Sequence, residues 1–250
     1  MKLSKYLAGA MALFLTAAMP VMAGAITADE VLRKLDDNQV SKTRWFASKM
    51  TIEKGGKTLI KEMQGYGASE GNKFLITFTN AEDRGVKYLK LDENLWIYLP
   101  DADDVMKISG HMLRQGMMGS DLSYEDMLSL EQLNKKYSAS LNGETQVSGV
   151  NCHVLEIKAK VPDVTYYREV ICVDAKRFLP LRIELYAKSG RLLKTMESSG
   201  IKEQKGRYYS TKTVIKDMKR KDSLTTLDLI ELKLDAPVPK DTFTRQNLSK

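Results

Sequence analysis

The sequence contains few of the residues that most often carry enzymatic, redox or metal chemistry. Its 250 residues include two histidines, His111 and His153, and two cysteines, Cys152 and Cys172. The cysteines form no C-x-x-C pair, the histidines form no cluster, and no glycine-rich phosphate loop precedes a helix. The acidic run DADD at 101–104 lacks the glycine and the closing glutamate of a calcium loop. We therefore expect no metal and no cofactor.

A serine hydrolase is the one catalytic alternative that the residues suggest. Ser109, His111, Ser120 and Asp121 lie near one another in the sequence. The stretch MGSDLSY, however, does not supply the G-x-S-x-G elbow that such an enzyme places at a strand-to-helix turn. The chain also lacks the alternating strand and helix pattern of that fold. We predict that the protein is not an enzyme.

Long hydrophobic runs are also scarce, and the prominent one lies at the start of the chain. Lys2 and Lys5 precede an apolar run from Tyr6 to about Met19, and small residues follow it as far as Ala25. This is the layout of a secretory signal peptide, and the run is shorter than the ~20 residues that span a bilayer. We predict a signal peptide over residues 1–23, cleaved after Ala23 or Ala25. Residues 24–250 would then be a single exported domain.

The predicted export limits the partners that the chain can meet. The formal net charge of +7 falls to +5 when Lys2 and Lys5 are removed, and the clearest basic cluster is KDMKRKD at 216–222. Export makes nucleic acid an unsuitable partner, and a short charge run between strands is usually a solvated turn. Attraction to an anionic membrane surface is the remaining reading of this excess charge.

Export would also place the two cysteines in an oxidising compartment, where a disulfide persists. Cys152 and Cys172 lie in strand-like runs on either side of a turn near Pro162. A hairpin centred on residue 162 would bring them nearly opposite each other, within reach of a disulfide. Each could instead be a small core residue. We predict a structural disulfide.

Apolar periodicity predicts one N-terminal helix followed by mainly β structure. Thr27 and Glu30 have the spacing of a capping box, and Val31, Leu32 and Leu35 then share one helical face. From residue 44 the period changes to two, as in RWFASKMTIE, and turn signals such as KGGK recur about every ten residues. About eleven strands are expected in one domain. So many strands must close into a barrel or curl to protect their edges.

The strands pause between His111 and about Asn134, where the stretch GMMGSDLSYEDM lies. Ser123 can cap a short helix, with Glu125 and Asp126 in its first turn. The chain has thirteen methionines, and those at positions 106, 112, 117 and 118 are among the ones in or just before this region. Methionine either fills cores or packs against variable apolar partners. The region is therefore either core or a movable apolar lid that pivots on neighbouring glycines.

Four segments together resemble the LolA-like outer-membrane lipoprotein-sorting family of exported bacterial proteins. The resemblance covers essentially the whole mature chain, and its most specific part is Met-Gly-Ser-Asp-x-Ser-Tyr-Glu-Asp at 118–126. The segments are FTNAEDRGVKYLKLDENLWIYLPDADDVMKIS, GMMGSDLSYEDM, FLPLRIELYAKSGRLLK and DTFT.

The resemblance implies a mainly β fold, an incompletely closed antiparallel half-barrel whose concave apolar face is covered by short helices. It also implies a periplasmic carrier that binds the acyl chains of lipoproteins or lipids and takes part in outer-membrane lipoprotein sorting. Such a carrier would meet an inner-membrane transporter, an outer-membrane acceptor and, transiently, a membrane. The alternatives on the same fold are a sensor of envelope ligands and an accessory protein of an inner-membrane exporter.

Within this fold we expect apolar side chains from the strands to form the concave wall and apolar side chains from the interrupting segment to gate its mouth. The predicted wall residues are Phe46, Met50, Phe74, Phe78, Trp96 and Tyr98. The predicted mouth residues are Met112, Leu113, Met117, Met118 and Leu122.

Overall fold

The structure is a computed structural model that describes residues 26–250 except residues 40, 71, 129–136 and 163. The signal peptide predicted for residues 1–23, with its cleavage after Ala23 or Ala25, lies outside the described residues. Helix α1 (Ala28–Gln39) comes first in the described chain and is followed by thirteen strands and several short helices. Within the described residues, no helix combines the length and the apolar character needed to cross a bilayer.

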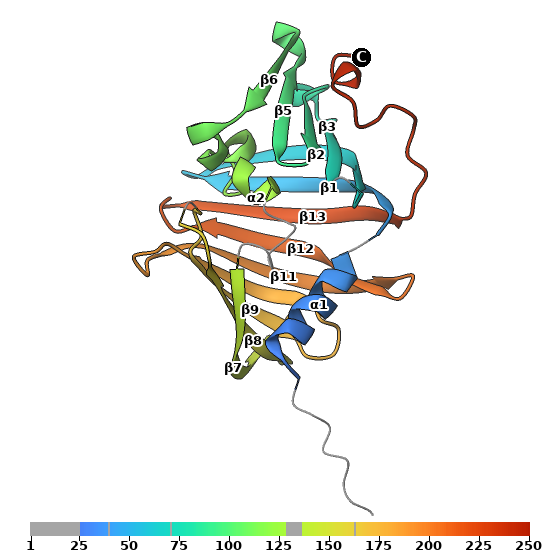
Figure 1. The fold of residues 1–250 in the computed structure, drawn as a ribbon. Helices are drawn as coiled ribbons and strands as arrows, with labels where there is room; N and C mark the ends of the chain where they lie inside the picture. Colours follow the sequence, from blue (N-terminus) through green and yellow to red (C-terminus); the bar gives the residue numbers. More distant parts are fainter. Residues whose placement is uncertain (1–25, 40, 71, 129–136, 163) are drawn as a thin grey trace, which may run out of the picture.

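All thirteen strands belong to one antiparallel sheet (Figure 1). The strands are β1 (Thr43–Lys54), β2 (Lys57–Ala68), β3 (Lys73–Phe78), β4 (Lys87–Leu91), β5 (Asn94–Leu99), β6 (Asp104–Ile108), β7 (Tyr137–Val147), β8 (Val150–Ala159), β9 (Arg168–Asp174), β10 (Pro180–Tyr186), β11 (Leu192–Gln204), β12 (Arg207–Asp217) and β13 (Ser223–Leu234).

The first and the last strand, β1 and β13, are neighbours in the middle of the sheet. The strand order runs β6-β5-β4-β3-β2-β1-β13-β12-β11-β10-β9-β8-β7, so every neighbouring pair is consecutive in sequence except β1 and β13. The edge strands β6 and β7 do not pair, and the sheet stays open. This confirms the predicted fold, an incompletely closed antiparallel barrel with an N-terminal helix and short helices, with thirteen strands in place of about eleven.

Local chemistry explains where the elements begin and turn. The backbone N–H of Glu30 donates to the Thr27 hydroxyl oxygen at 3.2 Å, which confirms the capping interaction at the start of α1. The β1–β2 hairpin turns at Gly55 and Gly56, whose φ angles of 55° and 74° favour glycine. Both features were readable from the sequence because each depends on neighbouring residues alone.

Cross-strand pairing carries one apolar face across the sheet. Met50 of β1 is paired with Leu227 of β13, and on the other half Leu155 of β8 is paired with Ile171 of β9. On β1–β6 this face packs under short helices, whereas on β7–β9 it packs against Val31, Leu32 and Leu35 of α1. Figure 1 shows α1 and the short helix α2 (Tyr124–Leu128) on the same, concave side of the curved sheet.

The predicted disulfide is wrong, because the two thiols are not bonded. Cys152 pairs with Asp174 across the ladder, and Cys172 pairs with Val154. The β8–β9 pairing is therefore centred one residue beyond Pro162, which moves the cross-strand partner of each cysteine by two positions. The cysteines become diagonal neighbours on one face, a wider spacing than that of directly opposed residues.

The C-terminal segment covers the outer face of β3–β5. Figure 1 shows it returning from β13 to the region of β3. Leu248, fully buried, packs there with Leu75 and Leu89. The Lys87 ammonium donates to the backbone carbonyl of Lys250 at 2.6 Å. The outer face therefore has an apolar cluster of its own, separate from the concave one.

We predict that Leu248→Ala lowers the free energy of unfolding by about 2 to 4 kcal/mol, because it removes a fully buried leucine from a packed cluster. Urea denaturation measures the change, and Ser249→Ala at the exposed neighbouring position is the matched control. Equal midpoints for the two variants would show that the C-terminal segment does not stabilise the sheet.

Candidate functional site

The segment from Gly110 to Leu128, here named the lid segment, crosses the concave face of β1–β6. It contains η3 (Gly110–Arg114), η4 (Met117–Gly119) and α2. The backbone N–H of Met117 donates to the carbonyl of Leu122 at 2.7 Å, which closes a compact loop. A side chain at Gly116 would come within 2.0 Å of the Ser120 carbonyl, so the loop requires glycine there.

The lid segment and the strands beneath it share one apolar cluster. Its buried members include Met50, Phe78 and Met117, and partly buried apolar side chains pack around the buried set. The predicted wall and mouth residues that the structure brings together are Phe46, Met50, Phe74, Phe78, Met112, Leu113, Met117, Met118 and Leu122. Whether these residues bind an acyl chain stays a prediction.

Trp96 and Tyr98 were wrongly placed on the concave wall. In β5, Leu95 and Ile97 point into the concave cluster, so Trp96 and Tyr98 must point to the other face. There they pack with the cluster under the C-terminal segment. The error was one of register, since LWIYL is apolar at every position and its sequence does not mark the inward side.

A buried tyrosine that the sequence did not single out supports the lid from below. The Tyr88 hydroxyl lies 3.3 Å from the Met118 sulfur and 3.2 Å from the Tyr124 hydroxyl. Burial, together with Tyr124, raises the pKa of Tyr88, so its hydroxyl stays protonated and can donate. Met118 itself has a φ of 52°, a conformation that this packing must hold in place.

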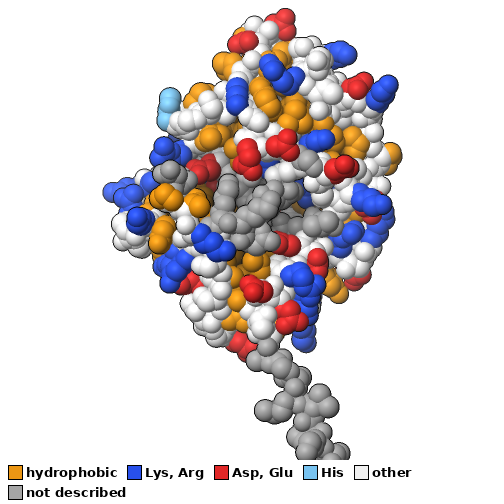
Figure 2. Space-filling model, viewed as in Figure 1, with side chains coloured by type: hydrophobic (Ala, Val, Ile, Leu, Met, Phe, Trp, Pro, Cys, Tyr) orange, Lys and Arg blue, Asp and Glu red, His pale blue; other side chains and the backbone are white. Residues whose placement is uncertain are grey.

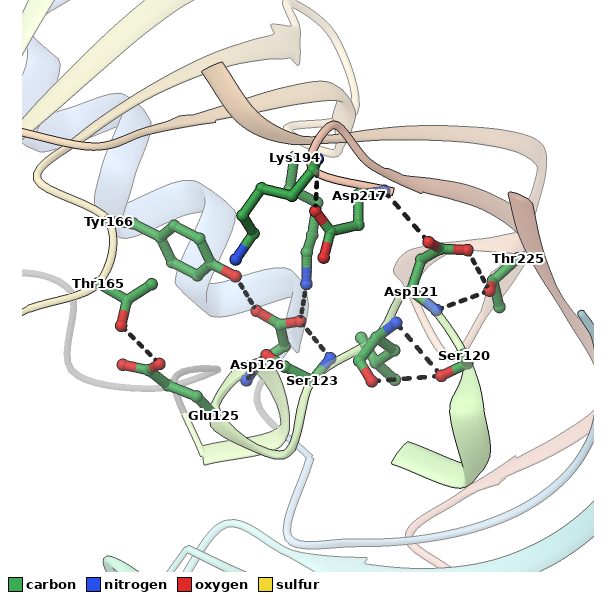
Figure 3. A network of polar contacts seen from close by, with 12 residues as sticks. Ser120, Asp121, Ser123, Glu125, Asp126, Thr165, Tyr166, Lys194, Asp217 and Thr225 are labelled. Atoms are coloured by element: carbon green, nitrogen blue, oxygen red, sulfur yellow. Dashed lines mark hydrogen bonds and ion pairs between the residues drawn. The ribbon is translucent and has the colours of Figure 1, made fainter. Parts of the chain in front are cut away.

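Polar side chains of the lid segment anchor it to the strands (Figure 3). The Asp121 carboxylate accepts hydrogen bonds from the hydroxyls of Ser223 at 2.9 Å and Thr225 at 2.8 Å. Its backbone N–H donates to the Thr225 hydroxyl oxygen at 2.9 Å. Asp121 is almost fully buried, so these bonds replace the water that it loses.

Asp126 forms the second anchor, on the other half of the sheet. Its carboxylate is ion-paired with the buried Lys194 ammonium of β11, and it accepts a hydrogen bond from the Tyr166 hydroxyl at 2.7 Å (Figure 3). It also accepts the backbone N–H of Ser123 at 2.7 Å, while the Ser123 hydroxyl accepts the N–H of Asp126 at 3.3 Å. The predicted Ser123 cap is thus confirmed. Its partner Asp126 also ties the lid segment to β11 through Lys194.

Glu169 of β9 is a further buried acid on the concave side of the sheet. It lies in register with Leu185 of β10, whose side chain is buried. Burial and, to a smaller extent, the charge of Asp126 raise the pKa of Glu169 to about 7. This carboxyl therefore changes charge near neutral pH, close to the Asp126 anchor.

The residues considered for serine hydrolysis are held in structural roles. The Ser120 hydroxyl contacts the backbone of Leu122 at 3.2 Å, and Asp121 is engaged with β13 as described. A G-x-S-x-G match also occurs at 67–71, but it begins within the last residues of β2 and leads into strand β3 rather than a helix. Its Ser69 hydroxyl donates to the Ser41 carbonyl at 2.6 Å. Among the residues described, no group of three or more His, Cys, Asp or Glu side chains could hold a metal.

The buried charged residues Lys194 and Glu169 were missed by sequence reasoning, although a signal was present. Each is a charged residue at an inward position of an otherwise apolar alternation. Lys194 lies two positions before Met196, and Glu169 lies two positions before Ile171. A charge in that register must find a partner or shift its pKa. Which partner it finds depends on long-range packing that the alternation does not encode.

We predict that Lys194→Met lowers the free energy of unfolding by about 3 to 5 kcal/mol, because it leaves the Asp126 carboxylate buried without its cation. Asp126→Asn combined with Lys194→Met should recover part of the loss, since no unpaired charge then remains. Urea denaturation measures both. Lys212→Met, at an exposed position on β12, is the matched control, and an equal effect from it would contradict the anchor.

We also predict that the free energy of unfolding of Glu169→Gln, compared with that of the wild type, becomes larger as pH rises. Between the ordinary pKa of 4.5 and the folded value of about 7, the folded state keeps a proton that the unfolded state has lost. Wild-type stability therefore falls across that window by up to about 3 kcal/mol, and the glutamine variant escapes this fall. Denaturation midpoints from pH 4 to 8 test this. A constant difference across pH, or the same trend in exposed Glu197→Gln, would contradict it.

The comparisons with known proteins bear on the fold first. A family model described as "Uncharacterized protein" matches residues 70–250. No curated protein matches the chain in sequence. The chain is similar to the crystal structure of a DUF1329 family protein from Desulfovibrio piger, with 29% identity, a TM-score of 0.81 and coverage of 88% of this chain and 97% of that chain.

Two further crystal structures share the fold at lower identity. A putative outer membrane lipoprotein-sorting protein domain from Vibrio parahaemolyticus has 21% identity, a TM-score of 0.80 and coverage of 88% and 97% of the two chains. A LolA superfamily protein from Nitrosomonas europaea has 22% identity, a TM-score of 0.73 and coverage of 89% and 100%. The chain therefore belongs to the family whose model matches residues 70–250, and its fold is the LolA-like fold.

Proposed function

We propose that the protein is a periplasmic carrier that binds acyl chains of lipoproteins or lipids between the lid segment and the concave face of the sheet. The observation that carries this proposal is the apolar cluster beneath the lid segment. Half-buried Met112, Met118 and Leu122 pack there on strand residues, whereas Asp121 and Asp126 hold the segment by polar bonds. The LolA-like fold supports a lipoprotein or lipid carrier role.

The physical task of such a carrier is to shield a long apolar chain from water. An acyl chain of about 16 carbons costs on the order of 10 kcal/mol to expose, at about 0.8 kcal/mol per methylene. A cover of flexible thioether side chains can repack against chains of different length and still release them. The half-buried methionines Met112 and Met118 of the lid segment have this property, whereas Met117 is buried within the cluster.

The two anchors suit this task because they fix the lid segment without occupying the apolar face. Asp121 binds β13 and Asp126 binds β11, so both polar contacts lie where the segment meets the central strands. The apolar side chains toward β3–β5 remain held by dispersion contacts alone, apart from the Tyr88 hydroxyl. An acyl chain could replace those contacts at little cost, since apolar contacts are exchanged for apolar contacts.

The proposed partners follow from this cargo. A carrier would take its acyl chain from an inner-membrane transporter and deliver it to an outer-membrane acceptor, with transient membrane contact at each step. Export by the predicted signal peptide would place it in the periplasm. The chemistry is binding and release, and the acids and hydroxyls of the lid segment act in folding rather than in catalysis.

We predict that Met118→Ser combined with Leu122→Ser weakens binding of a fluorescent fatty-acid probe by about tenfold to a hundredfold, because two apolar contacts with the acyl chain are lost. Fluorescence titration of the purified protein measures the affinity. Near-ultraviolet circular dichroism establishes that the double variant keeps its tertiary packing.

Ile230→Ser is the matched control for this experiment, since Ile230 is an exposed apolar residue on β13 outside the concave cluster. It should bind the probe as the wild type does. Equal weakening in the control, or full affinity in the folded double variant, would overturn the assignment of the lid segment as the acyl-binding cover.

A further inference from the structure

Four turns lie side by side at one end of the sheet. The β1–β2 and β12–β13 turns touch, since the Gly55 N–H donates to the Asp222 carbonyl at 3.1 Å. The β10–β11 turn lies beside the β12–β13 turn, because the Met218 N–H donates to the Leu193 carbonyl at 2.8 Å. The loop before β9 joins them through the Tyr167 N–H and the Tyr186 carbonyl, 2.9 Å apart. These turns are named the basic end below.

Exposed cations collect on the basic end. They are Lys54, Lys57, Lys188, Arg191, Lys216, Lys219 and Lys221, with Arg114 of the lid segment beside Lys219. Figure 2 shows Lys and Arg side chains gathered at the left of the molecule, where Figure 1 places these turns. None of these eight side chains forms an ion pair with a described residue, and the exposed acids among the described residues of these turns are Glu53 and Asp222.

At the opposite end of the strands, three cations lie beside acids, although Lys42, Lys176 and Lys202 there form no ion pair with a described residue. Arg177 pairs with Asp174 at 3.0 Å, and Lys205 and Arg207 both approach Asp235, at 3.4 and 3.9 Å. Those charges largely neutralise one another, whereas those of the basic end add. A field of one sign attracts a partner of the opposite sign over roughly a Debye length, about 8 Å at physiological salt.

Apolar side chains accompany the cations. Leu59 and Ile60 of β2, Val161 before β9 and Met218 after β12 lie at this end, with exposures of 48%, 50%, 39% and 44%. They make up four of the six most exposed large apolar side chains in the described part of the chain. Cations interleaved with exposed apolar side chains match a surface that presents anionic groups above an apolar layer.

An open groove lies between two of the turns. Its volume is about 500 Å³, and its lining includes three lysines, Lys54, Lys57 and Lys216, and two acids, Glu53 and Asp222. The ammonium groups can donate to phosphate oxygens, and lysine acts in such sites as a mobile point charge. The groove is therefore large enough and basic enough to receive a phospholipid headgroup.

The basic end also contacts the lid segment directly. The Arg220 guanidinium donates to the Ser120 carbonyl at 2.6 Å and to the Gly119 carbonyl at 3.2 Å. The same turn that carries Lys219 and Lys221 thus holds the loop at 116–122 of the lid segment. A membrane lying against this end would be next to the lid segment, where an acyl chain enters under the proposed function.

We propose that the basic end is a docking surface for membranes rich in anionic phospholipid. This inference extends the proposed function, but the binding it describes needs no acyl cargo and can be measured apart from it. A phosphate-bearing bilayer surface is complementary to the cations, the exposed apolar side chains and the groove together.

Vesicle flotation tests the proposal with the full exported chain. Vesicles of phosphatidylglycerol mixed with phosphatidylcholine should capture the protein at low salt, and pure phosphatidylcholine vesicles should not. The triple variant Lys54→Glu, Lys219→Glu, Lys221→Glu should bind the anionic vesicles about a hundredfold more weakly. Salt of about 0.5 M should release the wild type, since surface charges are then screened.

The matched control is Lys42→Glu, Lys176→Glu, Lys202→Glu, which changes the net charge equally at exposed positions of the opposite end. It should retain most of the binding. Equal loss in both triples would show attraction by net charge alone, and undiminished binding of the basic-end triple would show that another surface docks. Either result overturns the proposal. Should the glutamate triple misfold by circular dichroism, the corresponding glutamine triple takes its place.

The same proteins separate this inference from the proposed function. Titration with a fluorescent fatty acid in the absence of vesicles should give the same affinity for the wild type and the basic-end triple. A wild type that docks on anionic vesicles but binds no fatty acid would contradict the carrier proposal and leave the docking surface in place. A wild type that binds fatty acid but not anionic vesicles would contradict the docking surface and leave the carrier proposal in place.

Discussion

The ion pair of Asp126 with Lys194 is the contact on which the arrangement of the molecule depends. A carboxylate and an ammonium group buried together must satisfy each other and their remaining hydrogen bonds, or the cost of removing them from water is not offset. Tyr166 and the backbone of Ser123 complete that set. The bond therefore dictates where α2 sits over the sheet, and it ties a helix of five residues, too short to be stable alone, to β11.

The lid segment is held on the concave face by polar and by apolar contacts, and the two kinds restrict its position differently. Polar bonds from Asp121 and Asp126 are directional and fix one position of the lid segment over the central strands. The apolar contacts of Met118 and Leu122 with the β1–β6 half are non-directional, so other apolar groups can replace them. The open sheet leaves its concave face accessible to the lid segment, which covers that face in place of further strands.

Sequence patterns predicted the features that depend on near neighbours. The cap at Thr27, the Gly55-Gly56 turn and the Ser123 cap follow from a few adjacent residues, and strict alternation assigned Phe46 and Phe74 to the correct face. Prediction failed where the local pattern was ambiguous or the partner was distant. The uniformly apolar LWIYL run concealed the outward direction of Trp96 and Tyr98, and a shift of one residue in the centre of a hairpin separated Cys152 from Cys172. Lys194 lies 68 positions from Asp126, too far for any local rule.

Native mass spectrometry of the mature protein, purified from a bacterial periplasm without detergent, tests the central claim most directly. A carrier with an apolar face beneath a replaceable cover should retain part of its cargo through gentle purification. The account predicts complexes whose added mass matches a lipid or an acylated peptide and is lost on collisional activation. A protein that carries no such mass, and acquires none after incubation with acylated peptides, would contradict it.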